Sequence, residues 1–237
     1  MDLLFPTLFS KTFFVLSLQL LITWISAHVT LIKFRQLHDK KVHWITSTNN
    51  EHGQLDIHVN WEHVKGYFYG LLIADIAVFL VLLFWGQHQP LGIGLSIFGI
   101  WSILVGIGMA LCLLSVDENL GSKVLAITTT IVFGTFVVGV YSQIDFGFLG
   151  LALFIALICL ILFNLARLFI AIPRAAQRWV AGIGAVIFTL YLVYDFNRLA
   201  KMEAAGINNW NAAINISISI YLDIINLFLE ILDAMSQ

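Results

Sequence analysis

Two aspartates stand at the edges of long apolar runs near the end of the chain. Asp195 follows five apolar or aromatic residues in LYLVYDFNRLA, and Asp223 lies in similar company in IYLDIINLFLE. If their side chains meet in a poorly hydrated site, both carboxylates cannot ionise cheaply, and the pair would share one proton as a coupled unit. The pair would then act as a proton switch. The alternative is that each aspartate only pins a helix end, with Arg198 as a local ion partner of Asp195.

A stripe of polar residues runs through the last apolar segment around Asp223. Its members recur at steps of three or four residues, which places them on one face of a helix. They are Asn211, Asn215, Ser219, Asp223, Asn226 and Glu230. The opposite face is Ile, Leu and Phe, so the stripe must face protein or water, because an unpaired polar group in hydrocarbon is expensive. A tail helix lying in the membrane interface is the other interpretation, and the lack of Lys and Arg argues against it.

A third aspartate, Asp75, lies in the middle of GLLIADIAVFLVLLF with no cation near it in the sequence. Charged side chains at bilayer depth cost about 2.5–3.5 kcal/mol on insertion scales, so they tend to face other helices and to mark function. We therefore expect Asp75 to be protonated or to pair with a group from another helix.

The composition points to a membrane. Of the 237 residues, 60% are hydrophobic and only 11% are charged, against roughly 25% charged in soluble domains. Runs of about 20 apolar residues let helices cross about 30 Å of hydrocarbon, and they are too long for barrel strands. We predict an all-α membrane protein, a seven-transmembrane-helix bundle forming a single domain over residues 1–237. The expected helices are at about 10–32, 66–86, 91–115, 123–142, 146–170, 177–197 and 211–233.

The first of these runs could also pass for a signal peptide, with Lys11 before its apolar core. It is long enough to span the bilayer, and residues 25–27 make a poor cleavage site, so we expect a retained helix. The links between the later runs are short, which predicts antiparallel neighbours.

Residues 33–65 form the one hydrophilic segment and hold five of the seven histidines. These are His38, His43, His52, His58 and His63. They are scattered without the close spacing that a zinc site needs, so metal binding is the less favoured interpretation and no cofactor is expected. A hydrophilic loop or a short hairpin is favoured, because QLDIHVNW alternates like a strand.

Several classes of protein lack support in the sequence. There is no P-loop, HExxH or GxSxG motif, and no basic patch with interleaved aromatic residues that would indicate nucleic-acid binding. An intramembrane aspartyl protease would also use two aspartates, and Tyr194-Asp195 resembles one of its motifs. Its Gly-x-Gly-Asp partner motif is missing, because Asp223 follows Tyr221-Leu222. We therefore expect that the protein is not an enzyme.

Three patches resemble the transmembrane Bax inhibitor motif family, a set of small seven-helix membrane proteins. They are IDFGFLG, IFTLYLVYDFNRL (Ile187–Leu199) and ISIYLDIINLFLEIL (Ile218–Leu232), of which the last two are fairly specific. The expected order of helices agrees along most of the chain. Residues 33–65 depart from the pattern, being longer than the usual first loop of the family.

The resemblance implies a pH-sensitive, calcium-permeable leak channel or transporter that is gated by Asp195 and Asp223. Calcium prefers six to eight oxygen ligands, so the pair would hold it only weakly and in passing. Asp75 matches an acidic position that lines the path in relatives. The residues expected along the ion path are Asp75, Asn215, Ser219, Asn226 and Glu230.

One element of the family pattern is missing. Relatives can carry an arginine at the inner end of the second helix that latches onto the aspartate pair, but this chain reads Trp85-Gly86-Gln87-His88 there. Arg198 or His88 could take over the latch, and a histidine would lose its charge near pH 6.5 when unperturbed. The alternative function is a membrane interaction protein that modulates a membrane-bound protease or complex without conducting ions. Residues 33–65 favour that alternative.

The expected location is multi-pass in a bacterial inner (plasma) membrane, or in an organelle membrane if the source is eukaryotic. The lipid bilayer, calcium and protons are the expected partners. The orientation is open to two interpretations, because nine Lys and Arg follow the first, third and fifth helices and three lie elsewhere. The positive-inside rule then places the N-terminus outside, whereas the resemblance places it in the cytoplasm. We follow the resemblance, since five of the nine lie in residues 33–65.

Overall fold

The structure is a computed structural model of the whole chain. It describes residues 3–40, 42, 45–49, 55–114, 116, 118–167, 170 and 172–236, without the side chains of residues 45–49, 55–59, 61, 63 and 118. His43, His52 and the side chains of His58 and His63 thus lie outside the described part. Within that part, no group of three or more His, Cys, Asp or Glu side chains could hold a metal ion.

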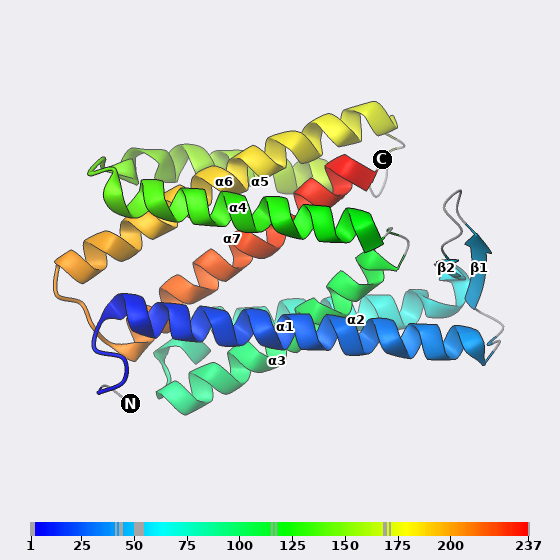
Figure 1. The fold of residues 1–237 in the computed structure, drawn as a ribbon, viewed down its shortest axis with the longest axis horizontal. Coiled ribbons are helices and arrows are strands. Elements are labelled where there is room, and N and C mark those ends of the chain that lie inside the picture. The colour runs from blue at the N-terminus through cyan, green and yellow to red at the C-terminus, as the bar shows by residue number, and fades with distance from the viewer. Residues whose placement is uncertain are drawn as a thin grey trace. The chain divides into compact units, whose positions relative to one another are not determined.

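Helices dominate the described chain (Figure 1). In order, the elements are α1 (Leu8–Asp39), β1 (Ile45–Asn49), β2 (Leu55–Val59), α2 (Trp61–Phe84), η1 (Gly86–His88), α3 (Leu91–Leu113), α4 (Glu118–Tyr141), η2 (Phe146–Phe148), α5 (Leu149–Ala166), α6 (Arg174–Ala204) and α7 (Trp210–Ser236). Seven of the helices found in the described residues are long and apolar enough to cross a membrane. The prediction of an all-α membrane protein with seven transmembrane helices is confirmed.

Two helices extend beyond their predicted ends. Helix α1 continues to Asp39, so residues 33–39 are helical rather than part of the hydrophilic loop. Helix α6 continues to Ala204, because Lys, Met, Glu and Ala are good helix formers despite their polarity. The length of the apolar run determines how much of a helix lies in the hydrocarbon of the membrane. The helix itself can continue beyond that run into water.

Helix α6 ends in a turn built on Gly206. The Gly206 N–H donates to the Glu203 carbonyl at 2.9 Å, and the Ile207 N–H donates to the Met202 carbonyl at 3.0 Å. This is a Schellman end, which needs a left-handed residue, and Gly206 supplies it with a φ of 75°. Helix α7 starts at once, with the Asn209 Oδ1 accepting from the Ala212 N–H at 2.8 Å. The two helices are therefore joined by a tight reversal.

The hydrophilic segment contains a hairpin. Strands β1 and β2 pair antiparallel from Ile45 opposite Val59 to Asn49 opposite Leu55. Of the two predicted forms of residues 33–65, a loop or a short hairpin, the structure has the hairpin, and the strand predicted from QLDIHVNW is β2.

The chain divides into two compact units. Unit 1 holds residues 1–12 and 119–237, and therefore the start of α1 and helices α4 to α7. Unit 2 holds residues 13–118, and therefore most of α1, the hairpin and helices α2 and α3. The prediction of a single transmembrane domain stays a prediction.

Helices α6 and α7 form the most extensive helix pair of unit 1, and Figure 1 shows α6 in yellow to orange and α7 in orange to red. Helix α7 is the most buried of the spanning helices, with Ile214, Tyr221 and Leu227 fully covered. Lipid tails are as apolar as these side chains, so close packing and interhelical hydrogen bonds stabilise such a pair. The interpretation of this segment as a helix lying in the membrane interface does not fit.

In unit 2, polar side chains join α1 to α3. The Ser102 hydroxyl donates to Gln19 Oε1 at 2.9 Å, and both residues are fully buried. Close by, the Ser26 hydroxyl donates to the Ile103 carbonyl at 2.8 Å. The first of these bonds is buried and the second is exposed. Hydrogen bonds between helices help to fix which faces of the two helices meet.

Candidate functional site

The structure brings Asp195 and Asp223 together. Their carboxyl groups lie within hydrogen-bonding reach of each other across α6 and α7, and the residues are only 4% and 7% exposed. A carboxylate can only accept hydrogen bonds, so a bond between two carboxyl groups requires that one of them hold a proton. The arrangement in the structure therefore suits a pair that carries one proton.

One carboxyl oxygen of this pair is exceptional. Asp223 Oδ2 is buried and has no hydrogen-bond partner among the described residues. Buried polar atoms without partners are uncommon in native proteins, and they often mark a functional site or a bound water or ion. The pair is thus an incompletely satisfied polar centre in an otherwise apolar helix interface.

Arg198 bridges the same two helices next to this pair. Its Nη2 donates to Asn215 Oδ1 at 3.0 Å, and its positive charge acts on Asp195 from nearby. No ion pair with Asp195 is found in the part of the chain that the structure describes. The alternative in which Arg198 is a direct ion partner of Asp195 therefore does not fit, and a latching role for Arg198 stays a prediction.

Towards the C-terminal end of α7, Arg167 gathers three acceptors. Its Nη1 contacts Asp233 Oδ2 at 3.0 Å and Asn164 Oδ1 at 3.3 Å, and its Nη2 donates to Gln177 Oε1 at 2.9 Å. One guanidinium thus joins the last part of α5, the first turn of α6 and the end of α7. Sequence reasoning did not find this cluster, because Arg167 and Asp233 are 66 residues apart.

Glu230 lies beside that cluster in a space left by a glycine. A Cβ atom at position 184 would lie 2.5 Å from Glu230 Cδ and 2.7 Å from Oε2. The Glu230 carboxyl group therefore occupies the space that a side chain at position 184 would fill.

The predicted polar stripe of α7 has a graded environment. Asp223 is buried, Asn215, Ser219, Asn226 and Glu230 are half-buried, and Asn211 is exposed. Asn226 Nδ2 donates to the Leu222 carbonyl of its own helix at 2.9 Å. The helical spacing was thus predicted correctly, while lining of an ion path by these residues stays a prediction.

Asp75 and His88 both belong to unit 2. The Asp75 carboxyl group interacts with the Trp101 side chain of α3, while its buried Oδ1 has no hydrogen-bond partner in the described residues. His88 is exposed in η1. The expectation that Asp75 pairs with a group from another helix fits this contact, and the path and latch roles of the two residues remain predictions.

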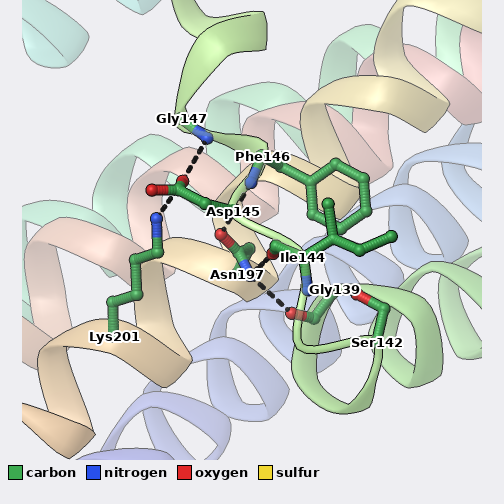
Figure 2. Close-up of polar contacts among 8 residues, drawn as sticks. All are labelled: Gly139, Ser142, Ile144, Asp145, Phe146, Gly147, Asn197 and Lys201. Atoms are coloured by element: carbon green, nitrogen blue, oxygen red, sulfur yellow. Dashed lines mark hydrogen bonds and ion pairs between the residues drawn. The ribbon is translucent and has the colours of Figure 1, made fainter.

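Asn197 is a polar anchor that sequence reasoning missed (Figure 2). Its Nδ2 donates to the carbonyls of Gly139 and Ile144, both at 3.0 Å, and its Oδ1 accepts from the Phe146 N–H at 3.2 Å. One buried amide of α6 thus fixes the whole link from α4 to α5. An asparagine two residues after Asp195, inside an apolar run, was the signal that could have indicated it.

Asp145 closes the same link on its exposed side. Its Oδ1 accepts from the Gly147 N–H at 2.7 Å and forms an ion pair with Lys201 of α6, as Figure 2 shows. The hydrogen bond from Lys201, followed by that from Gly147, holds the pKa of the Asp145 carboxyl group below its usual value. The charged form therefore stabilises the link.

The fold and the site together define a class of protein. It is a seven-helix membrane protein in which two carboxyl groups are buried against each other on the last two helices. The chain belongs to the Bax inhibitor family, because the family model described as "Inhibitor of apoptosis-promoting Bax1" matches residues 6–237. The matched range contains all three patches on which the resemblance rests. The predicted family and its seven-helix type are thereby confirmed.

Relatives of the chain are found in bacteria and in plants. An uncharacterized protein of Helicobacter pylori is 32% identical over 178 residues, which cover 73% of this chain and 74% of the relative. Protein LIFEGUARD 1 of Arabidopsis thaliana is 28% identical over 173 residues, covering 72% of this chain and 71% of the relative. A BI1-like protein of the same plant is 36% identical over 93 residues, covering 39% of this chain and 34% of the relative.

Proposed function

We propose that the protein is a pH-sensitive, calcium-permeable leak channel or transporter, gated by the proton that Asp195 and Asp223 share. The observation that carries this proposal is the contact between two buried carboxyl groups from different helices. Membership of the Bax inhibitor family supports it. The proposed setting is a bacterial inner membrane, or an organelle membrane in a eukaryotic cell.

The gate depends on whether the pair of Asp195 and Asp223 carries one negative charge or two. With one proton, the carboxyl groups hydrogen-bond and hold α6 and α7 together in the closed state. Without it, two like charges would lie in contact, and at about 4 Å and an effective dielectric constant of about 20 they repel by ~4 kcal/mol. That repulsion favours a state in which the helices have separated at this level. Arg198, which is hydrogen-bonded to Asn215 in the closed state, would then be the nearest cation to compensate the pair.

Calcium would be the transported ion rather than a resident cofactor. The separated carboxylates, with Asn215 and Asn226 as neutral oxygen donors on the same stripe, offer fewer ligands than the six to eight that tight calcium binding needs. Weak binding suits conduction, because an ion must leave as readily as it enters. Ser219, Glu230 and Asp75 are the further residues proposed for the path.

The test is calcium entry into proteoliposomes that contain a calcium dye, measured between pH 5.5 and 8. Replacing both Asp195 and Asp223 by Asn keeps their size and removes the shared acidic proton, so calcium entry should lose its response to pH. The matched control is Asp39→Asn, which makes the same change at an 80% exposed side chain. An unchanged pH profile in the double variant would refute the gate.

A second function rests on the β1–β2 hairpin. Each strand has its partner on one side in the described residues, and an open strand edge can pair with a strand of another protein. We propose, as the alternative, a membrane interaction protein that modulates a membrane-bound protease or complex. Deleting residues 45–59 should then abolish co-purification of such a partner, and the intact protein should pass no calcium in proteoliposomes.

A further inference from the structure

The first turn of α1 is completed by a residue far away in the chain. Glu203, in the last turn of α6, accepts the Phe9 N–H on its Oε2 at 3.1 Å. Thr7 and Ser10 satisfy two more amides reciprocally, each hydroxyl accepting from the other residue's N–H at 3.1 Å. A carboxylate at the start of a helix is favoured by the free N–H groups and by the helix dipole. The start of α1 is thus tied to the end of α6.

Lys11 ties the same turn of α1 to the segment that follows. Its residue is only 3% exposed, its Nζ donates to the Asn208 carbonyl at 3.2 Å, and it lies 5.4 Å from the centre of the Trp210 ring. Phe5 packs edge-on against that ring, with centroids 5.9 Å apart. An ammonium group above an indole face is attracted by the ring electrons, and more strongly when water is excluded.

Two further hydrogen bonds flank this contact. Asn208 Nδ2 donates to the Pro6 carbonyl at 2.6 Å, and the buried Ser217 hydroxyl donates to the Thr12 carbonyl at 3.0 Å. Residues 5–12 therefore contact the end of α6, the α6–α7 turn and the start of α7, all within unit 1. We call residues 5–12 the strap.

We propose that the strap holds the α6–α7 turn closed, and that its release is the step that allows α6 and α7 to separate. The strap bonds to Glu203 before the turn, to Asn208 within the turn and to Ser217 after it. Helix packing alone would not require one short segment to make all three contacts. The proposal that the strap clamps the turn does not depend on the proposed function. As a control of calcium entry, the strap rests on the proposed function.

The chemistry of the strap makes it reversible. A buried ammonium group loses hydration, which its new contacts must offset, so docking of Lys11 gains less free energy than docking of an apolar side chain. The other contacts are single hydrogen bonds and one ring contact, each of which stabilises the docked strap only modestly. A clamp built from such contacts can open without unfolding the helices that it joins.

The experiment is amide hydrogen exchange of the full-length protein in detergent or nanodiscs. The amides of Ala205, Gly206 and Ile207 all donate to carbonyls of the last turn of α6, so their exchange reports opening of the turn. Lys11→Met keeps the apolar stem and removes the ammonium group, and it should speed exchange at these amides by about 10- to 100-fold, as expected for loss of a hydrogen bond to a charged group. The matched control is Lys123→Met, at an exposed position of α4, which should leave their exchange unchanged.

Asn208→Ala provides a second variant at an exposed position, where misfolding is not a concern. It should speed exchange of the same amides by severalfold, because it removes the bond to Pro6. Unchanged exchange in both Lys11→Met and Asn208→Ala would overturn the strap. Faster exchange with unchanged calcium entry in proteoliposomes would support the clamp and contradict its link to conduction, while the Asp195 and Asp223 variants test the gate separately.

Discussion

Helices α6 and α7 bury two carboxyl groups against each other, whereas α2 carries a single half-buried carboxyl group that faces an indole. In the first region, Asp195 and Asp223 are each other's partners. In the second, the Asp75 carboxyl group interacts with the indole of Trp101. The residue type is the same and the surroundings are apolar in both, so the partner decides the chemistry.

The difference separates a switch from an anchor. A carboxyl group that faces a second carboxyl group must exchange a proton or a charge when conditions change, because both cannot be ionised in contact. A carboxyl group that faces an N–H donor keeps a favourable hydrogen bond in either protonation state. We therefore expect perturbation of the α6–α7 pair to change pH responses, and perturbation of Asp75 to change stability.

The largest effect should come from placing a lysine in each region. Asp75→Lys sets an ammonium group against an N–H donor at bilayer depth and should lower the free energy of unfolding by about 3 kcal/mol. Asp223→Lys gives Asp195 an opposite charge and should leave stability nearly unchanged while removing the pH response. Thermal unfolding in detergent measures both, and equal losses of Tm would break the comparison.

The next effect concerns the anchor. Trp101→Phe keeps most of the ring packing against Phe79 and Phe98 but removes the indole N–H beside Asp75. If that N–H supports the carboxyl group, its loss should cost about 1–3 kcal/mol. Trp179→Phe, at a 77% exposed side chain, is the matched control and should have little effect. A similar change of Tm in the two variants would show that the indole N–H does not support Asp75.

A smaller effect should appear at Glu230, whose carboxyl group lies in the space beside Gly184. Gly184→Ala should displace the flexible Glu230 carboxyl group, whereas Gly182→Ala meets nothing within 4 Å and should stabilise α6 by up to about 1 kcal/mol. The two unfolding curves, compared at equal detergent concentration, measure the difference. Equal stabilisation by both substitutions would mean that Glu230 does not need the space beside Gly184.

The smallest effect should come from the exposed pair of Asp145 and Lys201. Because the pKa of Asp145 is lowered in the folded protein, its contribution is fully present above the ordinary aspartate pKa and is lost as the pH falls through the lowered value. Amide exchange at Phe146 and Gly147 should therefore rise only in acid. Asp145→Asn should remove this pH dependence, and its persistence would assign the effect to another group.

Much of the architecture follows from the sequence alone. Seven apolar runs gave seven spanning helices, and the step of three to four residues in the last run placed Asp223 and Glu230 on one face. The pairing of Asp195 with Asp223 could be expected because only a short link joins their helices. These are local properties of composition, spacing and link length.

What could not be predicted depends on contacts between distant residues. The acceptance of the Phe9 N–H by Glu203 joins residues 194 positions apart, and Arg167 reaches Asp233 across 66. The extra turns of α1 and α6 were missed for a different reason. The length of an apolar run indicates how much of a helix lies in the hydrocarbon of the membrane, but it does not indicate where the helix ends. Long-range polar contacts leave no periodic signal in a single sequence.

The link between α4 and α5 holds Gln143 at a φ of 58°, a left-handed value that non-glycine residues seldom adopt. The Asn197 amide holds residues on both sides of this position, because it bonds to Gly139 and Ile144 and, from 51 residues further along the chain, to Phe146. The shape of this connection therefore depends on a helix far away in the chain as well as on its own hydrogen bonds. A graft that copied residues 142–147 into another scaffold should lose their shape unless it also supplied the matching amide.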